Sequence, residues 1–216
     1  MGQGRRGIIW AVTVACSIGV AGACARAAVT PPMPTFAKTV VLTPTGGTVL
    51  IRLPGGRSGF AALNNGPTIV PVGTMVDTTA GRVRLTSADP GPPPAKLQSG
   101  QFFRGIFRIE QSRTKDGLVN LVIRDNPNQS VCGTRATRSA AVNGRVLGLL
   151  RGTAKGRFRT AGRFAAATVR GTDWGVRDRC DGTLTVVRRG VVVVRDFRLH
   201  KDVIVRAGQT YLAKAS

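Results

Sequence analysis

Short runs of alternating apolar and polar residues recur along most of the chain. In one of them Val83 and Leu85 fall on one face of an extended strand, and Arg82 and Arg84 fall on the other face. Each run is bounded by Gly, Pro, Asn or Asp, the residues that end strands and form turns. The runs are TVVLTP (39–44), TVLIRL (48–53), RVRLTS (82–87), GIFRIEQ (105–111), LVNLVIR (118–124), GTLTVV (182–187), GVVVVRDF (190–197) and DVIVRAG (202–208). This pattern predicts an all-β domain of short, mainly antiparallel strands, sandwich-like or solenoid-like.

Two segments depart from simple alternation. Residues 191–194 are all valine, which predicts a central strand covered on both faces. The segment ADPGPPPAK (88–96) is too rich in proline and glycine for a strand or a helix, so we expect a surface loop there.

The stretch that begins at Ala167 alternates in the same way. Thr168, Arg170 and Thr172 should lie on one face of a strand, with Gly171 permitting a bend. Asp181-Gly182 is a typical pair for a tight hairpin turn. We therefore expect one strand and then a hairpin in this region.

The N-terminus has the pattern of a secretory signal peptide. Arg5 and Arg6 precede the uncharged apolar stretch Gly7–Ala23, and small residues follow, so cleavage is expected after Ala25 or after Ala27. The apolar stretch is shorter than the roughly 20 residues of a spanning helix, which favours cleavage over a retained anchor. We expect a secreted or cell-surface protein.

The N-terminus also has partial matches to two other export signals. Cys24 follows Ala21-Gly22-Ala23 and would be the lipidation site of a lipoprotein, but alanine stands where such signals usually have leucine. Paired arginines are also found in twin-arginine signals, whose other usual residues are missing here.

The predicted organisation is a signal peptide (1–27), a proline-rich linker (28–38) and one all-β domain (39–216).

The cysteines support an extracytoplasmic setting. Cys16 and Cys24 belong to the signal peptide, which leaves Cys132 and Cys180 to form a disulfide in an oxidising compartment. Closing a loop of this length stabilises by about 4 kcal/mol in the chain-entropy model. Trp174 is expected to pack against this disulfide rather than to bind a ligand. His200 is the only histidine, so no zinc site and no other cofactor is expected.

The chain is strongly basic. Its formal net charge is +22, which falls to +19 when Arg5, Arg6 and Arg26 leave with the signal peptide. Such an excess favours anionic partners. The charges are spread along the chain and aromatic residues are few, so specific nucleic-acid binding is not expected. Candidate residues for an anionic partner are Lys155, Arg157, Arg159, Arg163, Arg188 and Arg189.

Catalytic motifs are missing from the sequence. There is no G-x-S-x-G, and GTAKGRF (152–158) lacks the spacing of a phosphate-binding loop. His200 has no triad partners at useful offsets and should be an exposed loop residue. Asp178 and Asp181 are expected to form turns and to pair with arginines. We therefore expect no enzyme and no small-molecule substrate.

Three motifs resemble the FecR-type extracytoplasmic domain family. They are VRGTDWGV (169–176), DGTLTVVRRGVVVV (181–194) and VIVRAGQTY (203–211), with VPVGTMVDTTAGRVRLTSA (70–88) as a weaker upstream element. The resemblance implies a β domain in an exported setting. Signalling members relay receptor occupancy to a sigma factor through a cytoplasmic segment. Only six residues precede the apolar stretch here, so that role is not expected to carry over.

Two functions remain open from the sequence. The first is a non-catalytic binding or scaffold module that contacts an anionic cell-wall polymer through its arginines. The second is a sensory or regulatory module that recognises an extracytoplasmic protein and works with a separate membrane component. The oligomeric state is not predicted.

Overall fold

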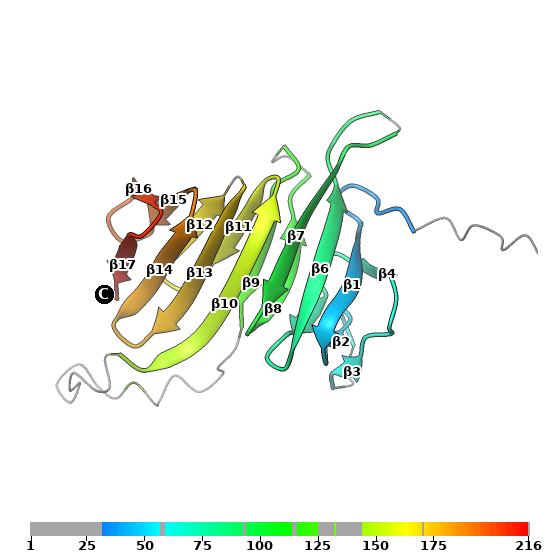
Figure 1. Ribbon diagram of the computed structural model, residues 1–216, viewed down its shortest axis with the longest axis horizontal. Helices are drawn as coiled ribbons and strands as arrows, with labels where there is room; N and C mark the ends of the chain where they lie inside the picture. Colours follow the sequence, from blue (N-terminus) through cyan, green and yellow to red (C-terminus); the bar gives the residue numbers. More distant parts are fainter. Residues whose placement is uncertain are drawn as a thin grey trace, which may run out of the picture. The chain divides into compact units, whose positions relative to one another are not determined.

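The computed structural model describes residues 32–56, 59–92, 94–113, 116–124, 132, 144–169 and 171–215. The predicted signal peptide and the start of the predicted linker lie outside these residues. The residues from Pro31 onward form one compact unit, whose described elements are strands in two sheets (Figure 1). The predicted all-β fold is confirmed, and the architecture is a sandwich.

The first sheet, called sheet A, has eight strands. In spatial order they are β17 (Thr210–Lys214), β14 (Gly182–Arg189), β13 (Thr172–Arg179), β10 (Val146–Lys155), β7 (Leu97–Phe103), β6 (Gly81–Ala88), β1 (Thr39–Gly47) and β4 (Thr68–Pro71).

The second sheet, called sheet B, has nine strands and lies behind sheet A in Figure 1. In spatial order they are β16 (Lys201–Arg206), β15 (Val191–Asp196), β12 (Ala165–Val169), β11 (Phe158–Ala161), β9 (Val119–Ile123), β8 (Ile106–Gln111), β5 (Met75–Asp77), β2 (Leu50–Arg52) and β3 (Ala61–Ala62).

The chain builds the two sheets in step as it advances. Hairpin β6–β7 belongs to sheet A, β8–β9 to sheet B, β13–β14 to sheet A and β15–β16 to sheet B. Pairing between described strands is antiparallel except for β9 with β11, which run parallel. The predicted loop at 88–96 is the connection of hairpin β6–β7, and its described residues are mostly exposed.

The core between the sheets is centred on aromatic rings. Phe102 of sheet A lies 5.5 Å from Phe158 and 6.0 Å from Phe107 of sheet B, measured between ring centroids. Trp174 of sheet A lies 6.1 Å from Phe102, edge to face, and its Nε1 donates a 3.1 Å hydrogen bond to Thr160 Oγ1 of sheet B. The indole therefore joins the two sheets by packing and by a buried hydrogen bond.

Two glycines make room for this core. A Cβ at Gly100 would lie 2.7 Å from the Phe102 ring, and a Cβ at Gly152 would lie 2.8 Å from the same ring. Both glycines stand inside strands, where glycine usually weakens the sheet. Here the missing side chains let one phenylalanine ring lie flat across two strands.

The prediction that residues 191–194 form a strand covered on both faces is wrong. β15 is indeed an interior strand of sheet B, but only Val192 and Val194 face the core, whereas Val191 is 42% and Val193 is 40% exposed. Among the described residues, no further layer covers the outward face of sheet B at this strand. β-branched residues stabilise a pleated sheet on either face, so a run of valines does not show that both faces of the strand are buried.

The expected single strand through Gly171 is also wrong. β12 ends at Val169 in sheet B and β13 begins at Thr172 in sheet A, with Gly171 at φ +64° between them. The chain changes sheet at this glycine, so Thr168 and Thr172 belong to different sheets. Hairpin β13–β14 is present, although its two-residue turn is Cys180-Asp181, and Gly182 already pairs with Arg179.

Cys132 and Cys180 lie at disulfide-bonding distance, as predicted, with Cα atoms 5.3 Å apart. They are buried with Leu147 in a small cluster of their own. Trp174 is buried as expected, but it packs in the main core and not against the disulfide. Trp174 stands six positions before Cys180 along an extended strand, a distance of about 20 Å.

No helix among the described residues has the length and apolar character needed to cross a membrane.

Candidate functional site

The outward face of sheet A carries a polar row that crosses six neighbouring strands. Register places one residue of each strand directly beside the next. From β1 to β14 the row is Thr43, Arg84, Gln101, Thr153, Asp173 and Arg189. Ser99 and Lys155 pair in a parallel row one step along the strands.

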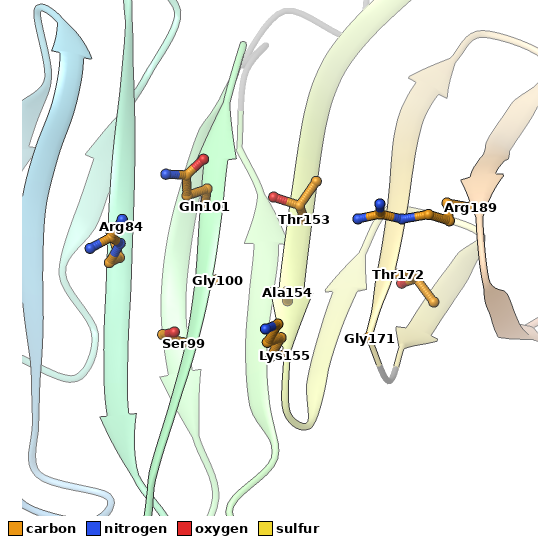
Figure 2. Close-up of a pocket in the computed structure, with 10 residues that line it drawn as sticks. All are labelled: Arg84, Ser99, Gly100, Gln101, Thr153, Ala154, Lys155, Gly171, Thr172 and Arg189. Carbon is orange, nitrogen blue, oxygen red and sulfur yellow. The ribbon is translucent and has the colours of Figure 1, made fainter.

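A shallow hollow of about 290 Å³ lies over this part of the sheet. Figure 2 shows Arg84, Lys155 and Arg189 around it, with Gln101 and Thr153 between them. With strands about 4.8 Å apart, Lys155 on β10 stands about 10 Å from the strands of each arginine. Three cations thus surround a floor of small and polar side chains.

Local structure fixes two of these cations. Lys155 ends β10, and Gly156 follows at φ +124° with no space for a Cβ, which would lie 2.6 Å from Gln98. Gln98 Oε1 accepts a 2.6 Å hydrogen bond from the backbone N–H of Arg157, which holds this turn. Arg189 ends β14 just before the turn at Gly190.

The register of β13 and β14 slips at this end of the hairpin. Trp174 pairs with Val187 and Asp173 with Arg189, so Arg188 is the extra residue of a bulge. Without the bulge, Arg189 would fall on the inward face, two positions after Val187. The extra residue Arg188 moves Arg189 to the outward face beside Asp173.

Two oxygen atoms in this wall are buried without a hydrogen-bond partner among the described residues. They are Thr172 Oγ1, whose residue lines the hollow, and Asp173 Oδ1. A threonine hydroxyl donates and accepts hydrogen bonds, and a carboxylate accepts them. Because both atoms are buried, the hydrogen-bonding groups that the hollow offers to hydroxyls are those of the half-buried Ser99, Gln101 and Thr153.

The cations of the hollow differ from those on sheet B. Within the described part of the chain, no carboxylate lies within 4.0 Å of Arg84, Lys155 or Arg189. On sheet B, Arg108 pairs with Glu110 and Arg195 pairs with Asp202. The three cations of the hollow therefore have no ion pair, although Asp173 is the neighbour of Arg189 in the strand register.

A larger hollow of about 670 Å³ on sheet B shows the same contrast. It is lined by Arg52, Met75, Arg108 and Glu110, among others. Arg52 contacts the sulfur of Met75 and lies 5.2 Å from the Phe60 ring, and Arg108 is paired with Glu110. Its arginines are already engaged within the protein.

A second cationic feature adjoins the sheet A hollow. Phe103 faces outward on β7, between Arg82 of β6 and Arg151 of β10. The guanidinium carbons lie 4.6 Å and 5.3 Å from the ring centroid. Cation–π contacts of this kind hold arginine side chains along the sheet surface while leaving their charge uncompensated.

The six residues proposed from the sequence do not form one site. Lys155 and Arg189 meet at the hollow. Arg159 lies on sheet B, where its Nε donates a 3.0 Å hydrogen bond to Asn120. Arg157 and Arg163 occupy the turns on either side of β11, and the Arg163 guanidinium lies 5.1 Å from the Phe164 ring. Arg188 is the exposed bulge residue of β14.

The two aspartates near Cys180 have structural roles. Asp181 pairs with Arg179 at 2.5 Å, as expected for an arginine partner. Asp178 is buried and accepts hydrogen bonds from the backbone N–H of Arg163 at 3.0 Å and from Thr183 Oγ1 at 2.5 Å. Burial raises the pKa of Asp178, against the lowering effect of these hydrogen bonds.

A second buried carboxylate joins the sheets near the C-terminus. Asp196 accepts hydrogen bonds from the backbone N–H groups of Arg198 and Leu199 and from the Tyr211 hydroxyl. Burial raises the pKa of Asp196, but these hydrogen bonds outweigh it, so the pKa lies below its usual range. His200 is exposed in the following turn, as expected.

Sequence reasoning missed most of the hollow. The alternation of β6 placed Arg84 on a solvent-facing side, but nothing joined it to Lys155 or Arg189. Ser99, Gln101 and Thr153 lie on strands that the apolar pattern did not reveal.

No family model, curated protein or solved structure matches the chain. The described residues contain no group of three or more His, Cys, Asp or Glu side chains arranged to hold a metal ion.

Proposed function

We propose that this protein is an exported, non-catalytic β module of the FecR-like type that binds an anionic polymer of the cell envelope. The observation that carries the proposal is the set of three cations without ion pairs, Arg84, Lys155 and Arg189, around a polar hollow on sheet A. The paired cysteines are compatible with an extracytoplasmic protein.

The outward face of sheet A suits an extended ligand better than a small one. The hollow is shallow, and its cations are spread over strands that span about 19 Å. Arg82 and Arg151 extend the positive surface beyond its rim. A flexible polymer with several negative groups would contact these cations together, with its hydroxyls placed against Ser99, Gln101 and Thr153.

The proposed binding is electrostatic and therefore sensitive to salt. Between about 50 mM and about 500 mM salt, the Debye length falls from about 14 Å to about 4 Å. Exposed charge pairs contribute about 0.5 kcal/mol each, so three cations together contribute about tenfold in affinity. We expect retention on a purified anionic wall polymer at the lower salt and release at the higher salt.

The test compares two variants with equal loss of charge. Replacing Arg84, Lys155 and Arg189 together by serine should weaken binding about tenfold. The control replaces three exposed arginines outside the strands by serine, namely Arg113, Arg124 and Arg145.

The control should bind almost as well as the native protein. If both variants weaken binding equally, net charge and not this face is responsible. If the native protein does not bind at the lower salt, the proposed function is wrong.

A further inference from the structure

Among the described strands, β16 is an edge of sheet B, and it carries one exposed apolar residue, Ile204, beside charged residues. Its six residues make it longer than the other edge strands, β17 with five, β4 with four and β3 with two. Ile204 on β16 is 58% exposed, and its neighbour on β15, Val193, is 40% exposed. Proteins usually shield a long apolar edge, because its free backbone groups pair readily with another strand.

The direction of the free backbone groups follows from one hydrogen bond. The N–H of Ala207 donates to the carbonyl of Gly190 at 3.0 Å, so residue 207 directs its backbone groups toward β15. Along an antiparallel strand these groups alternate in direction. Asp202, Ile204 and Arg206 therefore direct their N–H and C=O groups away from β15. The Arg206 N–H donates to Gln209 Oε1 at 2.9 Å and the Arg206 carbonyl accepts from the Gln209 N–H at 3.0 Å, so a partner strand must replace these two bonds. Among the described residues, the groups of Asp202 and Ile204 have no such partner.

The side chains of β16 distinguish between the ways in which two copies of this edge would pair. Antiparallel pairing must bring Asp202, Ile204 and Arg206 opposite the same set on the partner, since these residues direct their backbone groups away from β15. Placing Asp202 opposite itself would oppose like charges. Placing Ile204 at the centre of the pairing sets Ile204 against its own copy and Asp202 against Arg206 of the partner subunit.

We propose that the protein forms a two-fold dimer in which the β16 strands of two copies pair antiparallel, centred on Ile204. Sheet B then continues from one subunit into the other. On the outward face, the neighbours Val193 and Ile204 of one subunit lie next to Ile204 and Val193 of the partner subunit. Together they form one apolar strip across the dimer. On either side of this strip, Asp202 of one subunit faces Arg206 of the partner subunit.

Charge complementarity selects a second copy as the occupant of this edge. Each subunit supplies both Asp202 and Arg206 on the same outward face as Ile204, so the contact is complementary to itself, as a two-fold interface requires. Asp202 already lies 3.3 Å from Arg195 within its own subunit, which holds its carboxylate along this face.

The test uses sedimentation velocity of the exported, disulfide-bonded chain between about 1 μM and about 1 mM, the range of weak protein contacts. The native protein should shift from monomer to dimer as concentration rises. Asp202→Arg opposes two pairs of arginines, and Arg206→Asp opposes two pairs of aspartates. Each variant alone should weaken dimerisation about tenfold or more.

A mixture of the two variants gives the decisive result. One Asp202→Arg subunit and one Arg206→Asp subunit place opposite charges together at both contacts, so the mixture should dimerise where neither variant does. The matched control is Lys214→Asp on β17, the edge strand of sheet A. It reverses a charge outside the proposed contact and should leave the dimer unchanged.

Three results would overturn the proposal. They are a native protein that stays monomeric throughout the range, dimers that survive in both single variants, and a mixture that stays monomeric. Hydrogen exchange of the native protein gives an answer that needs no variant. The amides of Asp202 and Ile204 should become protected as concentration rises, and fast exchange of both at the highest concentration would also refute the dimer.

Discussion

The hydrogen bond from Trp174 to Thr160 gives the sharpest test of the sandwich. Trp174 is 1% exposed, and Thr160 is fully buried, so neither group has water as an alternative partner. A buried tryptophan covers about 150–250 Å², which at about 25 cal/mol/Å² corresponds to about 4–6 kcal/mol. Trp174→Ala should therefore reduce the free energy of unfolding by about 4 kcal/mol, within the range measured for such truncations.

Thr160→Val separates the hydrogen bond from the packing. The valine keeps the shape of threonine but leaves the indole N–H buried without an acceptor, which costs about 1–3 kcal/mol. Thr168→Val is the control, because Thr168 is half-buried on the outward face of sheet B. It should change stability by less than about 0.5 kcal/mol.

The assay is urea unfolding followed by circular dichroism, with each variant compared with the native protein. Trp174 is the only tryptophan outside the predicted signal peptide, so its fluorescence reports the same core in the native protein and in Thr160→Val. Equal stability of Thr160→Val and Thr168→Val would refute the buried hydrogen bond and the role of Trp174 in joining the sheets.

Three further predictions follow from the structure. Replacing Cys132 and Cys180 together by alanine should lower the free energy of unfolding by about 4 kcal/mol, and two free thiols in the mass spectrum of the unreduced native protein would contradict the bond. Burial raises the pKa of Asp178 in the folded state, so the stability that protonated Asp178 contributes is present below its unfolded pKa and is lost as pH rises through its folded pKa. Between about pH 4 and pH 7, the melting temperature should therefore fall less steeply with pH in Asp178→Asn than in the native protein. Equal slopes in the two proteins would exclude this effect. Asp173→Asn removes the one carboxylate from the polar row of sheet A and should strengthen binding to an anionic polymer in a low-salt retention assay, whereas weaker binding would place the ligand elsewhere.

The apolar pattern was sufficient for the strands that alternate cleanly. The strands now seen as β2, β8, β9 and β15 lie within predicted runs, and β1, β6, β14 and β16 overlap predicted runs and extend one to three residues beyond them. β7 and β10 were missed because Gly100 and Gly152 resemble turn signals, whereas they make room for the Phe102 ring. A glycine required by a neighbouring strand cannot be recognised before the strand order is known.

The candidate site depends even more on strand order. Arg84, Lys155 and Arg189 are far apart in the sequence and meet because β6, β7, β10, β13 and β14 are consecutive in sheet A. Local periodicity shows which residues of a strand share a face, but not which strands are neighbours. For the same reason, the sequence grouped Arg157, Arg159 and Arg163, which the fold distributes over two turns and the other sheet.

The sensory alternative and the family resemblance remain predictions from the sequence. The proposed function, binding of an anionic polymer, assigns the binding to a particular surface, the outward face of sheet A. Its location can be measured directly, because the two sheets have outward polar residues that serve as separate reporters.

The most direct measurement is a titration of the isotopically labelled protein with a purified anionic wall polymer, followed by amide chemical shifts at low salt. The account predicts shifts at Ser99, Gln101 and Thr153 on sheet A, which disappear at high salt, and unchanged signals at Asn120 and Thr168 on sheet B. Shifts confined to sheet B, or no shifts at all, would contradict the proposed binding face.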